Sequence, residues 1–173
     1  AGVTETEELA VNVVEAAEYS ISLAEGGNAI EGTYAFANAV VGYDPITATE
    51  VTVTRTGDGD ITNLAVVLSG ADAASFTITD PALTTLDGTN ESTTFTIKPN
   101  NDLAVGTYTA TVTVTADNSV SETFDITLEV IPTYTITVEA VAGGGTATVT
   151  TTPETETTEG TEVTVNISNI KEG

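Results

Sequence analysis

The strictest pattern in the chain lies between residues 106 and 130. Apolar residues alternate there with threonines as far as residue 115, and the alternation resumes after the polar residues 116–119. Successive side chains of a β-strand point to opposite faces, so this pattern predicts two long antiparallel strands joined by a short turn. Each strand has one apolar face, and a hairpin of this kind needs further strands to cover that face.

The chain supplies such strands upstream of the hairpin. Glycine- and proline-containing turns separate short apolar runs with β-branched or aromatic residues, and no helical pattern intervenes. We expect strands at 19–23, 34–36, 51–53, 64–68, 76–78 and 92–98. Proline after two of these runs should end them, since proline has no N–H to offer a neighbouring strand. Short strands at this spacing favour an all-β fold, an antiparallel β-sandwich over residues 19–131.

Residues 103–108, LAVGTY, open the first strand of the long hairpin. The form L-x-x-G-x-Y at that place is typical of a tyrosine corner, in which the phenol hydroxyl binds upstream backbone and fixes the crossover between two sheets. We predict this structural role for Tyr108. The simpler alternative is a tyrosine that only fills the core.

Residues 1–18 form an N-terminal extension that allows two interpretations. Leu9, Val11 and Val13 alternate as in a strand, whereas Thr4 and Glu7 have the spacing of a helix capping box. We favour the strand, because consecutive valines beside an asparagine weaken a helix. On that interpretation Leu9, Val11 and Val13 are a candidate donor strand with no partner in the extension itself.

After Pro132 the alternation begins again. Strands are expected near 134–138, 147–149 and 163–167, with a glycine turn at 143–145 and an acidic loop at 151–160. Three strands in residues 132–173 make a small C-terminal β domain that cannot bury a full core alone. Either this domain is cut short, or something else completes its sheet.

Several stretches resemble known repeats. Residues 33–57, 57–81 (GDGDITNLAVVLSGADAASFTITDP) and 92–117 (STTFTIKPNNDLAVGTYTATVTVTAD) resemble the Ig-like repeat of bacterial cell-surface proteins, which implies an Ig-like sandwich acting as spacer or adhesive module without catalytic residues. Residues 134–153, YTITVEAVAGGGTATVTTTP, resemble the opening of the β repeats of the internalin B-repeat type, which continue further than this chain does. The usual turn of the Ig-like repeat lacks the aspartates found here at 58 and 60.

Charge restricts the partners of this chain. It has 26 acidic and 3 basic residues and a net charge of −23, with Arg55, Lys98 and Lys171 as its cations. Such a surface repels nucleic acid and anionic lipid, which gain no counterion release from it. No apolar run approaches the roughly 18 residues that cross a bilayer. We therefore expect neither nucleic-acid binding nor membrane insertion.

Composition also limits the chemistry. His, Cys, Met and Trp are absent, which removes Ser-His-Asp and Cys-His catalytic sites, thiolate or imidazole zinc sites and haem ligation. We expect no enzymatic activity and no cofactor other than cations. Asp58 and Asp60 could offer oxygens to Ca²⁺, although a Gly/Asp turn needs no ion. The glutamates at 154, 156 and 159 are expected to form a solvated loop.

The remaining candidate sites are surface features. Tyr43 is the best candidate for an exposed ring that could stack on a sugar, and a loop anchor is its simpler role. The other tyrosines 19, 34, 108 and 134 fall in phase with buried positions. Asn90 and Asn166 lie in N-x-S sequons, so both are candidate glycosylation sites in an exported protein. Lys98 is out of phase with its apolar neighbours and should face water, which argues against a crosslink to it.

These patterns favour a non-enzymatic extracellular structural subunit, at the cell surface, of a stalk or pilus-like filament. A spare apolar strand at one end and an incomplete sheet at the other are complementary, so copies could join head to tail by β-strand complementation into a homo-oligomer. The alternative is an adhesin or carbohydrate-binding module of a cell-surface protein. The chain begins at Ala1 rather than Met, which we expect of an exported mature chain or of a fragment.

Overall fold

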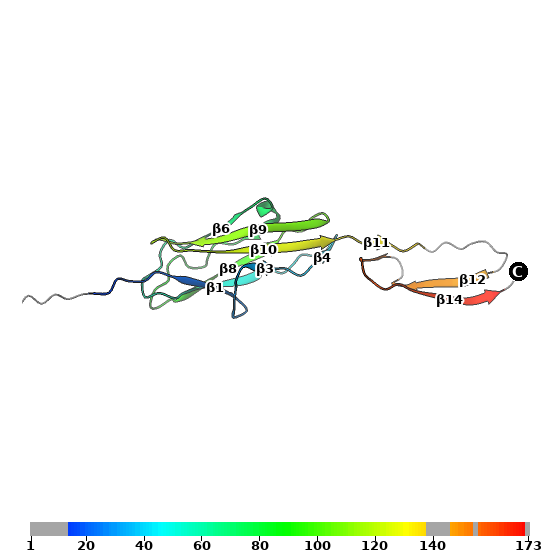
Figure 1. Cartoon of the computed structure of the whole chain (residues 1–173), viewed down its shortest axis with the longest axis horizontal. Coiled ribbons are helices and arrows are strands. Elements are labelled where there is room, and N and C mark those ends of the chain that lie inside the picture. Colours follow the sequence, from blue (N-terminus) through cyan, green and yellow to red (C-terminus); the bar gives the residue numbers. More distant parts are fainter. Residues whose placement is uncertain (1–13, 138–145, 154–155, 172–173) are drawn as a thin grey trace, which may run out of the picture.

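The structure is all-β, as the sequence predicts. The computed structural model describes residues 14–137, 146–153 and 156–171, and among them the one helical turn is the 3-10 turn η1 (Ala73–Ser75). Strands β1 to β10 form two sheets that pack face to face (Figure 1), and we call this unit the sandwich.

The first sheet has the strand order β2-β1-β5-β8-β7. Its strands are β1 (Ile21–Glu25), β2 (Asn28–Ala29), β5 (Thr49–Arg55), β7 (Phe76–Ile78) and β8 (Ser92–Pro99). In the second sheet β9 lies between β6 and β10, and β3 and β4 pair with the far side of β10. Its strands are β3 (Thr33–Ala35), β4 (Ala39–Val40), β6 (Ala65–Ser69), β9 (Gly106–Thr115) and β10 (Ser121–Ile131).

The predicted long hairpin is confirmed as β9 and β10. The two strands are antiparallel, with Phe124 opposite Val112 and Ile126 opposite Ala110. Asn118 and Ser119, at φ of 59° and 64°, form the turn between the strands. Two successive residues with positive φ match the right-handed twist of a two-residue hairpin, and a short polar side chain such as that of asparagine tolerates this conformation.

The core lies between the two sheets and consists of the alternating apolar residues that the sequence shows. The side chains that are almost fully buried include Val51, Val53, Phe95 and Ile97 in the first sheet and Val112, Val114, Ile126 and Leu128 in the second. Phe36 adds an aromatic contact, since its ring packs edge-on against Tyr34 with centroids 5.1 Å apart. Threonines occupy the outward positions of the same strands, where their hydroxyls meet water.

One pairing differs from the purely antiparallel sandwich that the sequence predicts. β3 and β4 run parallel to β10, with Tyr34 opposite Ile126 and Ala39 opposite Val130. The physical reason is that the chain leaves the first sheet after β2 and joins the second sheet beside its last strand, so the partners are not joined by a hairpin. Alternation of apolar residues predicts a strand but not the direction of its neighbour.

Two tyrosines are more exposed than the sequence predicts. The first strand begins at Ile21 rather than at Tyr19, and Tyr19 is 40% exposed, with its ring beside the α-carbon of Gly59. Tyr134 is 48% exposed, because only the two-residue strand β11 (Tyr134–Thr135) forms around it. The alternation rule fails at both places for one reason, that each tyrosine lies at the end of an element where no second layer covers it.

The C-terminal part contains two small sheets of two strands. β11 pairs with β13 (Glu156–Thr157), and β12 (Thr146–Thr152) pairs antiparallel with β14 (Thr164–Lys171). Strands near 134, 147–149 and 163–167 are therefore present, while residues 138–145 lie outside the described residues. The N-terminal residues Leu9, Val11 and Val13 also lie outside them, so the choice between strand and helix there stays a prediction.

Candidate functional site

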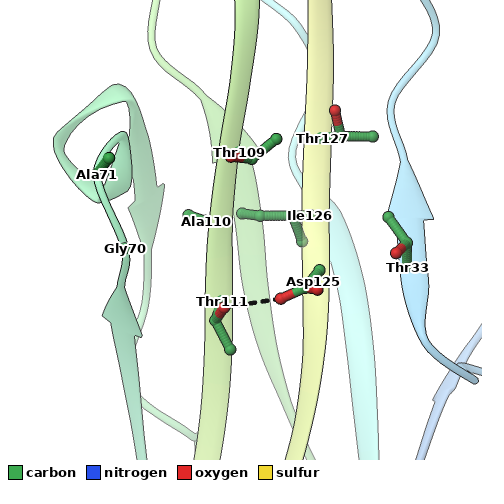
Figure 2. Close-up of a pocket in the computed structure, with 9 residues that line it drawn as sticks. All are labelled: Thr33, Gly70, Ala71, Thr109, Ala110, Thr111, Asp125, Ile126 and Thr127. Atoms are coloured by element: carbon green, nitrogen blue, oxygen red, sulfur yellow. Dashed lines mark hydrogen bonds between the residues drawn. The ribbon is translucent and has the colours of Figure 1, made fainter.

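One hollow among the described residues lies on the outer face of the second sheet. Figure 2 shows residues from three strands and one loop around it, most of them threonines or small residues. Its volume is about 500 Å³, and its lining comprises Thr33, Gly70, Ala71, Thr109, Ala110, Thr111, Asp125, Ile126 and Thr127. We call this hollow the threonine groove. The groove forms where the loop after β6 turns away from the sheet at Gly70, whose φ of 102° favours glycine.

Two polar side chains of the threonine groove are hydrogen-bonded to each other. Thr111 Oγ1 donates to Asp125 Oδ1 at 2.7 Å across the β9–β10 pair (Figure 2). Beside the groove, Asp72 Oδ2 accepts the backbone N–H of Thr109 at 3.0 Å. The groove thus offers hydroxyls and one carboxylate but no aromatic ring and no nucleophile with an adjacent base. Such a lining can hydrogen-bond a polar ligand.

Tyr108 lies where the chain crosses from β8 in the first sheet to β9 in the second. Its hydroxyl donates to the carbonyl oxygen of Ala104 at 2.9 Å, which is the contact that a tyrosine corner requires. Tyr43 supports the same crossover from the other side, because its hydroxyl donates to the carbonyl oxygen of Asn100 at 2.6 Å. Burial raises the pKa of Tyr43 above its usual value. Tyr43 is therefore a half-buried loop anchor whose hydroxyl is already hydrogen-bonded.

Replacing Tyr108 with phenylalanine should lower the free energy of unfolding by about 1 kcal/mol, because one neutral hydrogen bond is lost and the ring remains. Chemical denaturation of the two proteins measures the difference. Tyr134→Phe is the matched control, since no hydroxyl partner of Tyr134 is found among the described residues. A loss of equal size in both variants would show that the Ala104 contact contributes nothing.

Asp58, one of the two candidate calcium ligands, makes structural hydrogen bonds in its turn. Its Oδ1 accepts the backbone N–H of Glu18 at 2.6 Å, and its carbonyl oxygen accepts Arg55 Nη1 at 2.9 Å. Asp60 lies exposed in the same turn. Within the part of the chain that the structure describes, no three acidic side chains gather closely enough to hold a metal ion. The Gly/Asp turn thus holds the start of β1 in place.

The two sequons lie in different settings. Asn90 is exposed in a tight loop in which Asp87 Oδ1 accepts the N–H groups of Thr89 and Asn90, each at 2.8 Å. These backbone hydrogen bonds lower the pKa of Asp87 below its usual value. Asn166 lies within β14 opposite Thr150 and is also exposed. Both asparagines are accessible, and glycosylation of either stays a prediction.

The other charged candidates are dispersed. Lys98 lies on the outer face of β8, opposite Thr77, as its phase predicts. Of the predicted acidic loop, Glu156 lies in β13 and Glu159 is exposed, while Glu154 lies outside the described residues. Glu159 lines a hollow of about 410 Å³ at the end of β10, together with Glu129 and Asn38. No group of three acidic side chains among the described residues is placed to hold a metal ion.

The chain enters and leaves the sandwich at opposite ends. Gly59 donates its N–H to the carbonyl oxygen of Glu18 at 2.9 Å, and the next part of that loop, at Thr62, contacts Asp117 in the β9–β10 turn at 3.0 Å. The entry segment, residues 14–20, therefore lies at the turn end of β10. β10 then runs the full length of the sheet and leads through Pro132 into β11 at the other end (Figure 1).

Sequence reasoning missed the threonine groove and the role of Asp58. An acidic residue among outward threonines at Asp125 was the available signal for the groove, but the covering loop comes from residues 70–72, far away in the sequence. The hydrogen bond of Asp58 could not be inferred from the sequence, because its partner, the backbone of Glu18, is forty residues away.

No family model matches the chain, and no curated protein matches it. Among solved structures, a family 123 glycoside hydrolase from Clostridium perfringens is similar with a TM-score of 0.43 and 18% identity, over 58% of this chain and 23% of that one. This chain spans less than a quarter of that enzyme's length, and a likeness of this size says nothing about activity. No helix among the described residues is long and apolar enough to cross a membrane.

Proposed function

We propose that this chain is a non-enzymatic structural subunit of an extracellular stalk or filament. The observation that carries the proposal is that the chain passes through the sandwich from end to end, from Glu18 beside the β9–β10 turn to Pro132 at the far end of β10. A module with its two connections at opposite ends extends a chain in line, which is the geometry that a spacer needs. Two residues separate β10 from β11, so the sandwich joins the next unit with a minimal linker.

The resemblance to the Ig-like repeats of bacterial surface proteins supports the same proposal. Two face-to-face sheets and the hydrogen bond from Tyr108 to Ala104 are features that such a repeat would have. Repeats of that family act as spacers or adhesive modules, and on this basis we place the chain at the cell surface. The charge of −23 adds to this, since it keeps a crowded surface protein soluble.

Head-to-tail complementation is the form of assembly that we propose. Residues 9–13, near the N-terminus, carry alternating apolar side chains. At the other end of the chain, the C-terminal sheets have solvent-exposed apolar side chains. A contact between unlike ends of two copies repeats into an open filament. The high negative charge opposes such contacts between copies, so added salt should favour assembly by screening it.

Sizing and electron microscopy of the full chain test this proposal against a variant that lacks residues 1–13. We expect concentration-dependent oligomers or filaments from the full chain and monomers from the shortened one. The truncation stops before Glu18, whose contacts hold the start of β1, so the sandwich remains intact. Equal assembly of both proteins would rule out strand donation by residues 1–13. A full chain that stays monomeric would rule out the filament.

The threonine groove favours one other function, that of an adhesin or carbohydrate-binding module. Its hydroxyls and the carboxylate of Asp125 could hydrogen-bond a sugar, although it has no aromatic ring for stacking. Glycan-array binding by the full chain, compared with Asp125→Ala, separates the two functions. Binding that the substitution abolishes would favour the adhesin, and absence of binding favours the structural subunit.

A further inference from the structure

The outer edge of β14, with eight residues, is the longest sheet edge that the structure describes, followed by that of its partner β12 with seven. In the sandwich the edges are made by strands of two, three or five residues: β2, β3, β4, β6 and β7. β14 has eight residues and pairs, among the described residues, with β12 alone. Short edge strands protect a sheet from pairing with another chain, whereas a long uncharged edge is a template for it. Between Glu162 and Lys171 this edge has no charged residue.

The apolar face of this sheet is covered on one strand and open on the other. Val149 lies opposite Ile167, and Thr151 lies opposite Val165, so each pair shares one face. On β12, Thr151 is 7% exposed and Val149 is half-buried. On β14, Val165 is 53% and Ile167 is 60% exposed. Exposure therefore rises toward the outer edge of β14, which is where an added strand would lie.

The N-terminal segment of the same molecule cannot reach this edge. An extended chain spans at most about 3.6 Å per residue, so Val13, eight residues before Ile21, lies within about 29 Å of it. β10 has eleven residues, which is about 34 Å at the rise of an antiparallel strand. β1, which Ile21 opens, begins at the near end of the sandwich, and β14 lies beyond the far end (Figure 1). If residues 9–13 pair with β14, they come from a second copy.

Charge favours one direction for such a strand. In a parallel arrangement the acidic residues at positions 5, 7 and 8 would lie beside Glu159 and Glu162, where like charges repel. In an antiparallel arrangement they point toward the opposite end of β14, where Lys171 is one of the chain's three cations. The antiparallel direction therefore meets Lys171 and the adjoining Glu172 in place of two glutamates, so it brings fewer like charges together.

We propose that β14 is the acceptor for residues 9–13 of a second copy, which add to its outer edge as an antiparallel strand. Leu9 then lies opposite Ile167, and Val11 lies opposite Val165, so the apolar side chains of the donor cover the open face. This inference rests on the proposed head-to-tail assembly and specifies which strand receives the donor and in which register.

Disulfide trapping tests the register directly, because the chain has no cysteine of its own. Full-length Val11→Cys and Val165→Cys proteins are made separately, mixed and oxidised mildly. We expect a disulfide-linked pair in this mixture, since opposite residues of neighbouring strands bring their Cβ atoms within bonding range. Val67→Cys is the control partner, because Val67 is 52% exposed on β6 of the sandwich and should link to Val11→Cys only at background level.

Substitution of the acceptor provides a second measurement. Ile167→Asp should abolish assembly of the full chain, and Val67→Asp should leave it unchanged. Both side chains are mostly exposed, so circular dichroism should report an unchanged fold in each variant. Assembly that persists in Ile167→Asp, together with trapping no greater than in the Val67 control, would overturn the acceptor while leaving the filament intact. A full chain that neither assembles nor forms the disulfide would overturn both.

Discussion

Replacing Phe95 with alanine should lower the free energy of unfolding by about 3–5 kcal/mol, the usual cost of removing a buried phenylalanine. Phe95 lies in β8 and is 1% exposed. It pairs with Val51 across the first sheet and faces the second sheet, at the centre of the core. Loss of the phenyl ring removes apolar contacts from both sheets. It also leaves a cavity that the surrounding strands cannot fill by moving inward. Urea denaturation followed by circular dichroism measures the change.

Val67→Ala is the matched control for this prediction. Val67 is an apolar strand residue of the same sandwich, but it is 52% exposed on the outer face of β6. Its truncation should change the free energy of unfolding by no more than about 0.5 kcal/mol. If Phe95→Ala cost no more than this control, the core would not lie between the two sheets.

The all-β class was predictable because the information for it is local. Each long strand shows its buried face through residues two apart, and β9 and β10 were recognised in this way with their turn. Tyr108 was likewise recognisable, because the residues that fix the corner lie within six positions of one another. Features that depend on neighbours in the chain can be inferred from a single sequence.

Features that depend on distant segments could not be inferred. The parallel partners of β10 come from β3 and β4, about ninety residues earlier, and no local pattern specifies that pairing. The loop that shapes the threonine groove is also far in the sequence from the strands that line it. The backbone N–H that donates to the carboxylate of Asp58 is likewise far from Asp58 in the sequence. For the same reason alternation wrongly predicted Tyr19 as buried, because alternation says nothing about where the covering layer ends.

The proposed assembly and the acidic composition act in opposite directions. Each copy carries a charge of −23, so bringing copies together costs electrostatic free energy that falls as salt screens it. Burial of Val165 and Ile167 would oppose that cost. The edge of β14 has no charged residue between Glu162 and Lys171, so another copy can approach it with little electrostatic repulsion.

Gly57→Ala should lower the free energy of unfolding by about 1–3 kcal/mol, as overpacking does elsewhere in proteins. A Cβ at residue 57 would overlap the carbonyl oxygen of Glu18 and lie 2.7 Å from its carbonyl carbon and 3.1 Å from the backbone nitrogen of Ser20. These are backbone atoms, so the entry segment itself must move. The hydrogen bonds from Thr56 and Gly59 to that segment would weaken with it.

Gly88→Ala provides the control, because nothing lies within 4 Å of the Cβ that it adds. That substitution should be neutral, or should stabilise by up to about 1 kcal/mol by restricting the unfolded chain. Denaturation gives the stability of both variants, and sizing gives their assembly. Because the proposed donor, residues 9–13, is joined to the sandwich through the entry segment, Gly57→Ala should also reduce head-to-tail assembly at concentrations where the protein is still folded. Stability and assembly that match those of Gly88→Ala would mean that the entry segment adjusts freely and does not fix the direction of the donor.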